Sequence, residues 1–168
     1  MTKYLLDTNI YINFYDRYYR FNYFPSFWEK FEDILNSNVI LPKIVVSENY
    51  QDMAFKNWVD SHYRGQILNH KNYVESWAEV IQHIQLSDLY KDEALSSDRG
   101  WANESIADPW LLAIAKEEDL VIVTDERKNP SLNSIHPSKA AKIPDVAQDL
   151  GIRCITMNEF FGQLDFQI

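Results

Sequence analysis

The sequence predicts an α/β fold with a mainly parallel sheet. Three short apolar segments have the composition of buried strands, namely Lys3–Leu6, Leu120–Thr124 and Ile152–Thr156. The second segment is a β-branched run, typical of a strand that is buried on both faces. Segments with helical spacing separate the strands, and this alternation favours a parallel sheet. Because no repeat or Gly/Ser linker interrupts the 168 residues, we expect one domain, 1–168.

The first half of the chain is predicted to be mainly helical. Asp7–Asn9 ends the first strand with residues that favour helix caps, and a helix is expected from there toward Tyr18. Pro25 is expected to open a second helix, because proline suits the first helical position. Pro42 is expected to open a third, which would carry both Glu48 and Asp52.

The second half begins with a mostly helical pattern from about Trp58 to Leu95. The polar, acidic segment Ser87–Asn103 is expected to be largely loop. Asp108-Pro109 pairs a helix-capping residue with a proline at the first helical position, so a helix should follow. A last helix is expected over Pro144–Leu150, with Gly151 as its C-terminal cap.

Composition and charge narrow the classes of function. The chain has 25 acidic side chains against 16 Lys and Arg, a net charge of −9, which argues against a nucleic-acid partner until the acids are located. Cys154 is the only cysteine, which excludes an internal disulfide and a cysteine-based zinc site and suits a reducing, cytoplasmic setting. No stretch approaches about 18 uninterrupted apolar residues, so no membrane association is expected.

Acidic residues occur where a parallel sheet would bind a ligand. In open α/β sheets, ligands lie outside the carboxyl ends of the strands. Two predicted strands end in Asp7 and in Asp125-Glu126, Asp108 begins a helix, and Glu48 lies one or two turns into another. Brought together, these carboxylates would be unfavourable unless protons or cations neutralise them. Oxygen ligands select Mg²⁺ or Mn²⁺, which suit phosphoryl transfer.

Each of these acids also has a purely structural interpretation. Asp7 and Asp108 could be ordinary helix caps, and Asp125-Glu126 an ordinary polar turn. Glu48 could be a solvated charge on a helix surface, and Asp52, one turn later, competes with it for a functional role. The functional prediction therefore depends on the set rather than on any one residue.

The set resembles the motifs of PIN-domain nucleases. Leu5–Asn9 resembles their opening motif and Val46–Glu48 their second acidic motif, while Ala107–Ala115 and Val121–Glu126 resemble the third and fourth. The four segments follow the family's order and span most of the chain. Three further segments resemble one uncharacterised branch of PIN-like proteins: Tyr18–Phe21, Pro25–Trp28 and Lys142–Val146.

This resemblance implies a fold and an activity. The fold would be a three-layer α/β/α sandwich with a mainly parallel central sheet. The activity would be that of a Mg²⁺- or Mn²⁺-dependent endoribonuclease, which cleaves single-stranded RNA with a metal-activated water and is often the toxin of a type II toxin–antitoxin pair. Asp7, Glu48 and Asp108 would be the catalytic metal ligands, braced by hydrogen bonds from Asn9 and Thr124.

The fourth acid stays open between Asp125 and Glu126. The family usually has Thr, any residue, then Asp; Glu126 occupies the last place here and Asp125 the middle one. Neighbouring side chains of a strand point to opposite faces, so one of the two is expected to face the metal. The spacing favours Glu126, whereas the shorter Asp125 would suit a tight site.

Two other functions remain as alternatives. A haloacid-dehalogenase-like phosphatase also begins with a strand that ends in Asp, but its chemistry needs a second Asp two residues later, where this chain has Asn9. A PIN-like fold without catalytic activity, acting as an interaction module, would explain the irregular fourth motif.

Two segments bear on partners. The stretch 127–144 has no acid and carries four basic residues, so it is either a loop that grips a nucleic-acid backbone or a solvated loop. An aromatic-rich stretch is either a base-stacking surface for single-stranded RNA or, as we favour, core packing with an apolar face for a second copy of the chain or an antitoxin. Its ten aromatic residues are Tyr11, Phe14, Tyr15, Tyr18, Tyr19, Phe21, Tyr23, Phe24, Phe27 and Trp28.

Overall fold

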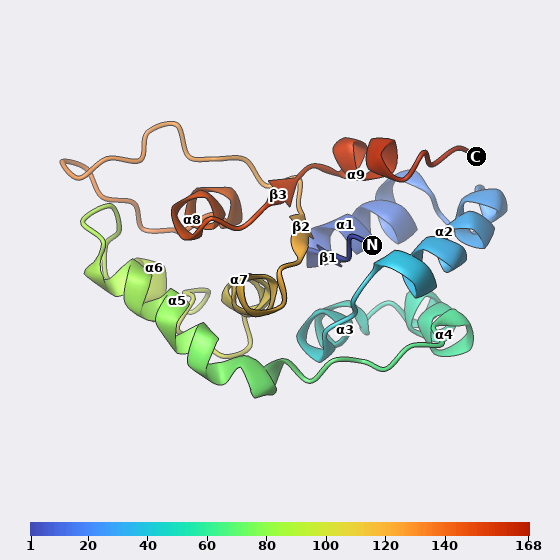
Figure 1. Cartoon of the computed structure of the whole chain (residues 1–168), viewed down its shortest axis with the longest axis horizontal. Coiled ribbons are helices and arrows are strands. Elements are labelled where there is room, and N and C mark those ends of the chain that lie inside the picture. The colour runs from blue at the N-terminus through green and yellow to red at the C-terminus, as the bar shows by residue number, and fades with distance from the viewer.

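The sheet is small and entirely parallel, as predicted. The computed structural model describes all of residues 1–168 as a mixed α/β fold with nine α-helices (Figure 1). The strands stand in the order β1 (Tyr4–Leu6), β2 (Val121–Val123), β3 (Cys154–Ile155). Strands β1 and β2 pair in parallel and are buried along their whole length. Their carboxyl ends therefore meet at one edge of the sheet, where Asp7 and Thr124 follow.

The helices of the first half begin largely where the sequence predicted. Pro25 opens α2, but the helix that carries Glu48 ends earlier than expected. Asp52 lies beyond its end and accepts a 2.9 Å hydrogen bond from the backbone N–H of Phe55, so it caps the next helix instead. The prediction that Glu48 and Asp52 share one helix is wrong. The elements are α1 (Thr8–Ile12), the π-helical η1 (Asn13–Tyr18), α2 (Pro25–Asn38), α3 (Lys43–Asn49) and α4 (Met53–His62).

The second half contains two helices that the sequence did not predict. A short helix interrupts the expected loop Ser87–Asn103, and another follows β3. Gly151 ends the predicted helix before β3 in the left-handed conformation, with φ of 69°, as expected. The elements are η2 (His70–Tyr73), α5 (Val74–Leu86), α6 (Glu93–Ser96), α7 (Ala107–Glu118), α8 (Ile143–Leu150) and α9 (Met157–Gln163).

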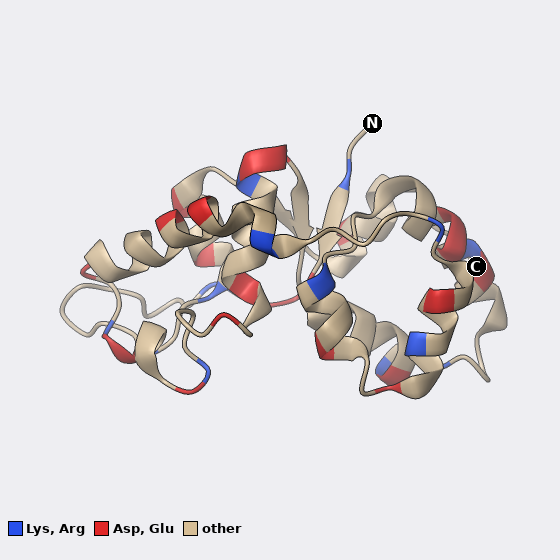
Figure 2. Ribbon diagram, turned by 90° about the horizontal axis from the view of Figure 1, so that it is seen from below, with Lys and Arg blue, Asp and Glu red and all other residues tan.

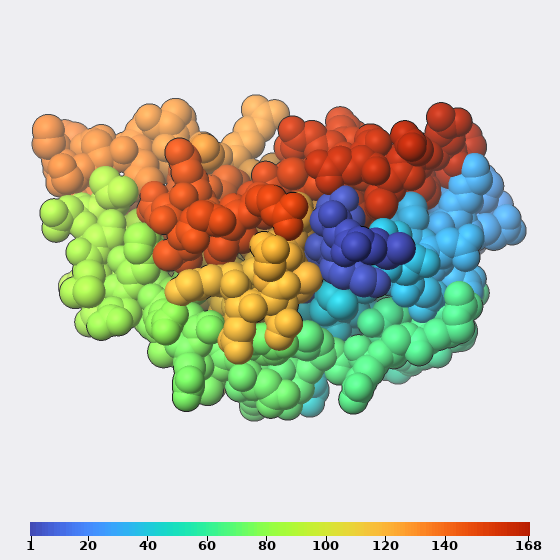
Figure 3. All heavy atoms as spheres, in the orientation of Figure 1, coloured from blue at the N-terminus to red at the C-terminus, as the bar shows by residue number.

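Helices lie on both sides of the sheet. Figure 1 shows α5, α7 and α8 to one side and α1 to α4 with α9 to the other. Helix α7 is the most deeply buried, since it lies between α5 and β2. The first and last parts of the chain lie side by side (Figures 1 and 3), where the Tyr4 hydroxyl donates a 2.8 Å hydrogen bond to Gln163 of α9.

Aromatic packing fills the side of the sheet that carries α2 and α4. Phe14 and Phe27 are fully buried, and Phe27 stacks on Tyr19 with ring centroids 4.1 Å apart. Most of the aromatic stretch is therefore core, as favoured from the sequence. Three of its residues remain exposed, Tyr18, Tyr23 and Phe24. We use the name aromatic cluster for the packed rings Phe14, Tyr19, Phe27, Trp28, Phe31, Trp58 and Phe161.

Charge is distributed over the whole molecule. Acidic residues occur on most helices rather than in one segment (Figure 2). None of the helices has the length and apolar character needed to cross a membrane.

Candidate functional site

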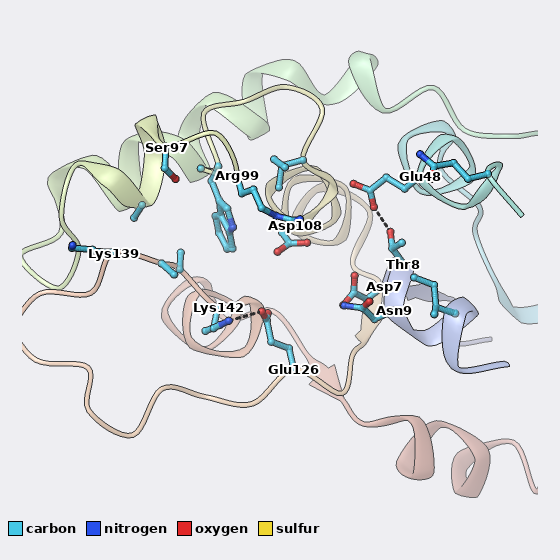
Figure 4. Close-up of a pocket in the computed structure, with 18 residues that line it drawn as sticks. Asp7, Thr8, Asn9, Glu48, Ser97, Arg99, Asp108, Glu126, Lys139 and Lys142 are labelled. Carbon is cyan, nitrogen blue, oxygen red and sulfur yellow. Dashed lines mark hydrogen bonds and ion pairs between the residues drawn. The ribbon is translucent and has the colours of Figure 1, made fainter. Parts of the chain in front are cut away.

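A cavity of about 690 Å³ opens beside the carboxyl ends of β1 and β2 (Figure 4). Four carboxylates from distant parts of the sequence line it, contributed by the residue after β1, by α3, by the first turn of α7 and by the segment after β2. They are Asp7, Glu48, Asp108 and Glu126, and we call them the carboxylate cluster.

Asp7 is the most buried member of the cluster. Its side chain accepts a 3.0 Å hydrogen bond from the Thr124 hydroxyl, and its backbone N–H continues the sheet by donating to Val123. Burial raises the pKa of Asp7 to about 6, against the hydrogen bond from Thr124, and the negative charges of Glu126 and Glu48 raise it further. Asp7 is therefore held where its own negative charge is unfavourable.

Asp108 lies in the first turn of α7 and interacts electrostatically with every other member of the cluster. Burial raises the pKa of Asp108 well above its usual value, and the charges of Asp7, Glu126 and Glu48 add to this effect. The ammonium of Lys142 opposes it. The predicted role of Asp108 as a helix cap is wrong, because α7 begins one residue earlier.

Glu48 connects the first turns of two other helices. One carboxylate oxygen accepts a hydrogen bond from the Thr8 hydroxyl at the start of α1, and the other accepts from the backbone N–H of Ala107, 3.3 Å away, at the start of α7. Partial desolvation raises the pKa of Glu48. The side chain thus satisfies an end of α7 that Asp108 was expected to cap.

The two neighbouring acids after β2 point in different directions. Glu126 faces the cavity, where its carboxylate lies 3.3 Å from the Lys142 ammonium and accepts a 2.8 Å hydrogen bond from the Ile143 N–H. Asp125 does not line the cavity; it accepts hydrogen bonds from the Asn13 side chain and from the Met157 N–H at the start of α9. Of the two alternatives that the sequence left open, the geometry brings only Glu126 to the cluster.

The two residues expected to brace the carboxylates behave differently. Thr124 is buried; its hydroxyl donates to Asp7 and accepts from the Glu126 N–H, so it couples two members of the cluster. Asn9 lines the cavity, but its side chain forms no hydrogen bond to a carboxylate. The expected bracing is present for Thr124 and absent for Asn9.

Several cavity residues were not singled out from the sequence. Thr8 lay within a quoted motif but was given no role, and Arg99 and Trp101 lay in a segment expected to be loop. No local pattern marks Arg99 or Trp101, because their position depends on where the segment between α6 and α7 folds back. Lys139 and Lys142 belong to the acid-free segment, whereas its other two basic residues lie outside the cavity.

A family model matches residues 4–168, which is almost the whole chain. The chain belongs to the DUF4411 family, a domain of unknown function. No curated protein matches it at a significant level. The match includes every carboxylate of the cluster, so the cavity lies within the DUF4411 domain.

The donor set of this DUF4411 domain suits a hard cation that keeps part of its hydration. No group of three or more His, Cys, Asp or Glu side chains is arranged to hold a metal ion. The carboxylates instead line a cavity, and three of them, Asp7, Glu48 and Glu126, already accept hydrogen bonds from protein groups. Mg²⁺ usually keeps several waters and is bound directly by only one or two carboxylates. These oxygens therefore suit an ion that keeps some of its waters better than an ion that is enclosed entirely by protein ligands.

Proposed function

We propose that this DUF4411 domain is a Mg²⁺- or Mn²⁺-dependent endoribonuclease that cleaves single-stranded RNA. The observation that carries the proposal is the carboxylate cluster itself, since four acids from separate segments line one cavity. Burial, together with the charges of the neighbouring acids, raises the pKa of Asp7 and Asp108. The cluster members are also the acids at which the sequence resembles PIN-domain nucleases.

The same resemblance supports a proposal about the fold. We infer that the parallel sheet and its flanking helices form a three-layer α/β/α sandwich of the PIN type. The strand order β1-β2-β3 and the helices on both sides of the sheet support this assignment. In open parallel sheets the ligand site is expected beside the carboxyl ends of the strands, which is where the cavity lies.

The residues of the carboxylate cluster and Thr124 have different roles in the proposed reaction. Asp7 and Asp108 would hold the cation, because they are the carboxylates whose negative charge is least compensated within the protein. Thr124 orients Asp7, and Glu48 and Glu126 complete an acidic wall. A bound Mg²⁺ or Mn²⁺ supplies activation of a water molecule and stabilisation of the leaving oxygen. Without a cation this wall would repel a phosphodiester.

The biological setting belongs to the proposal as well. We propose a cytoplasmic toxin of a type II toxin–antitoxin pair, with an antitoxin protein or a second copy of the chain as partner. The exposed aromatic side chains Tyr18, Tyr23 and Phe24 support a protein partner, because aromatic residues are enriched in protein–protein interfaces.

Cleavage of single-stranded RNA by the purified protein tests the activity. With Mg²⁺ or Mn²⁺ present, we expect cleavage that Asp7→Asn and Asp108→Asn each reduce by about a hundredfold or more, since each removes a metal ligand. Asp125→Asn is the matched control, because Asp125 lies next to Glu126 but outside the cavity. Cleavage that survives both cluster substitutions would exclude the proposed site.

One observation favours a second candidate, an interaction module without catalytic activity. Glu48 and Glu126 already have protein partners, and no compact ligand group is present. Titration with Mn²⁺ by calorimetry separates the two functions. Heat of binding that disappears in Asp108→Asn supports the nuclease, whereas no binding supports the module.

A further inference from the structure

The cavity has a basic wall as well as an acidic one. Three cationic side chains line it, although the chain as a whole has a net charge of −9. Arg99 comes from the segment between α6 and α7, and Lys139 and Lys142 come from the segment before α8. In Figure 4, Lys139 lies on the side of the cavity away from Glu48 and Thr8.

The three cations differ in how far the protein already uses them. Lys142 forms an ion pair with Glu126 and lowers the pKa of Asp108, so it belongs electrostatically to the carboxylate cluster. Arg99 lies close enough to lower the pKa of Glu48 but forms no ion pair. Lys139 forms neither an ion pair nor a side-chain hydrogen bond. Arg99 and Lys139 therefore keep their hydrogen-bond donors free beside the cavity.

An uncharged donor lines the same wall. Trp101 is only 3% exposed, and its indole N–H forms no hydrogen bond within the protein. An indole N–H is a donor only, and because no protein acceptor pairs with it, it is available to a ligand in the cavity. This neutral donor adds to the two free cationic side chains, and it can donate a hydrogen bond to an acceptor of a ligand.

The segments that carry these donors are held in place. A Cβ atom at Gly100 would lie 2.3 Å from the carbonyl oxygen of Leu95, so the chain between Arg99 and Trp101 passes directly against α6. The backbone N–H of Trp101 donates to the carbonyl oxygen of Ala94, and the backbone N–H of Ser138, beside Lys139, donates a 2.8 Å hydrogen bond to the carbonyl oxygen of Leu89. The donors are therefore positioned before any ligand binds, which lowers the entropy lost on binding.

We infer that Arg99, Lys139 and the Trp101 indole bind a second phosphate of a single-stranded nucleic acid, next to the phosphate held at the carboxylate cluster. This subsite rests on the proposed nuclease function. A guanidinium and an ammonium are the side chains that bind phosphate most strongly, and both remain free here. The volume of about 690 Å³ lies within the range of ligand cavities, so it admits a short stretch of strand rather than a duplex.

The subsite also accounts for how an acidic protein holds RNA. The carboxylate cluster attracts phosphate only through a cation, whereas the basic wall attracts it directly. A strand bound at both walls would have one phosphodiester at the carboxylate cluster and the next one bound by Arg99, Lys139 and the Trp101 indole.

Binding of a short single-stranded RNA to a cleavage-deficient chain tests the subsite. In an Asp7→Asn background with Mg²⁺, we expect Arg99→Gln and Lys139→Gln each to weaken binding about tenfold, as measured by fluorescence anisotropy. The slope of log affinity against log salt should fall by about 0.7 for each lost contact. Arg127→Gln and Lys91→Gln are matched controls, since both side chains are exposed, unpaired and outside the cavity.

The outcomes separate the subsite from the nuclease. Equal binding by the cavity variants and their controls, or no measurable binding by the parent at low salt, would overturn the subsite. Cleavage by the unmodified chain would then still support the nuclease. Selective loss of binding in the cavity variants, without cleavage by the unmodified chain, would support the subsite and overturn the nuclease.

Discussion

The aromatic cluster and the carboxylate cluster lie in the same domain, but neighbouring side chains have opposite energetic effects in the two. In the aromatic cluster, buried rings contact one another in stacked and edge-on arrangements, so each neighbour favours the folded state. In the carboxylate cluster, burial and then the charges of the other acids raise the pKa of Asp7 and Asp108, so each acidic neighbour disfavours the ionised form. The contrast indicates that one region stabilises the fold and that the other stores an electrostatic cost that a ligand can relieve.

Removing a ring from the aromatic cluster should have the largest effect on stability. Phe27 is fully buried and contacts Phe14, Tyr19 and Phe31. We expect Phe27→Ala to lower the free energy of unfolding by about 3–5 kcal/mol, because it leaves a cavity that the surrounding rings cannot fill. Chemical denaturation measures this change. Tyr23→Ala, at a position 74% exposed, is the control and should change stability by less than about 0.5 kcal/mol.

Neutralising an acid of the carboxylate cluster should instead increase the stability of the fold. A pKa raised from 3.8 to about 6 corresponds to a penalty on ionised Asp7 of up to about 3 kcal/mol at neutral pH. We therefore expect Asp7→Asn to raise the free energy of unfolding by up to that amount, because the amide can still accept the hydrogen bond from Thr124. Denaturation at pH 7 measures the gain, and Asp125→Asn should show none.

The pH dependence of that gain checks its cause. Because the folded-state pKa of Asp7 lies above the unfolded value, the folded chain binds more protons between about pH 4 and pH 6. The contribution of Asp7 to stability therefore falls as pH rises through this window and stays low above it. The difference between Asp7→Asn and the unmodified chain should accordingly vanish below about pH 4. A difference that is constant with pH would assign the gain to packing instead.

The sequence predicted the parts of the site that local patterns determine. Asp7 and Glu126 follow β-branched or apolar runs, and the carboxyl ends of parallel strands must share an edge, so their meeting followed from periodicity. Alternation along a strand predicted that one of Asp125 and Glu126 would face the site but left open which one; in the structure Asp125 accepts a hydrogen bond from Asn13 instead. Pro25 opened its helix as expected, because proline restricts the backbone regardless of tertiary contacts.

The parts that depend on tertiary contacts were missed or misassigned. Asp108 was expected to cap α7, yet Glu48, 60 positions earlier in the chain, accepts the hydrogen bond from the Ala107 N–H at that end. No local pattern can show such a long-range partner. Helix α9 was a different kind of omission, since Thr156 and Glu159 form a capping box that was readable from the sequence.

Divalent cations should produce the smallest of the expected effects and connect the two regions. If the carboxylate cluster binds Mn²⁺, a tenfold excess over the dissociation constant stabilises the fold by about 1.4 kcal/mol. We expect this stabilisation, measured as a rise in melting temperature on adding Mn²⁺, for the unmodified chain and for Phe27→Ala alike, because the aromatic cluster does not touch the cavity.

Asp7→Asn should lose most of the stabilisation by Mn²⁺. Lys142→Gln should increase it, since Lys142 offsets the charge of Glu126 and competes with the ion. Equal gains in all four chains would mean that Mn²⁺ binds elsewhere on the acidic surface.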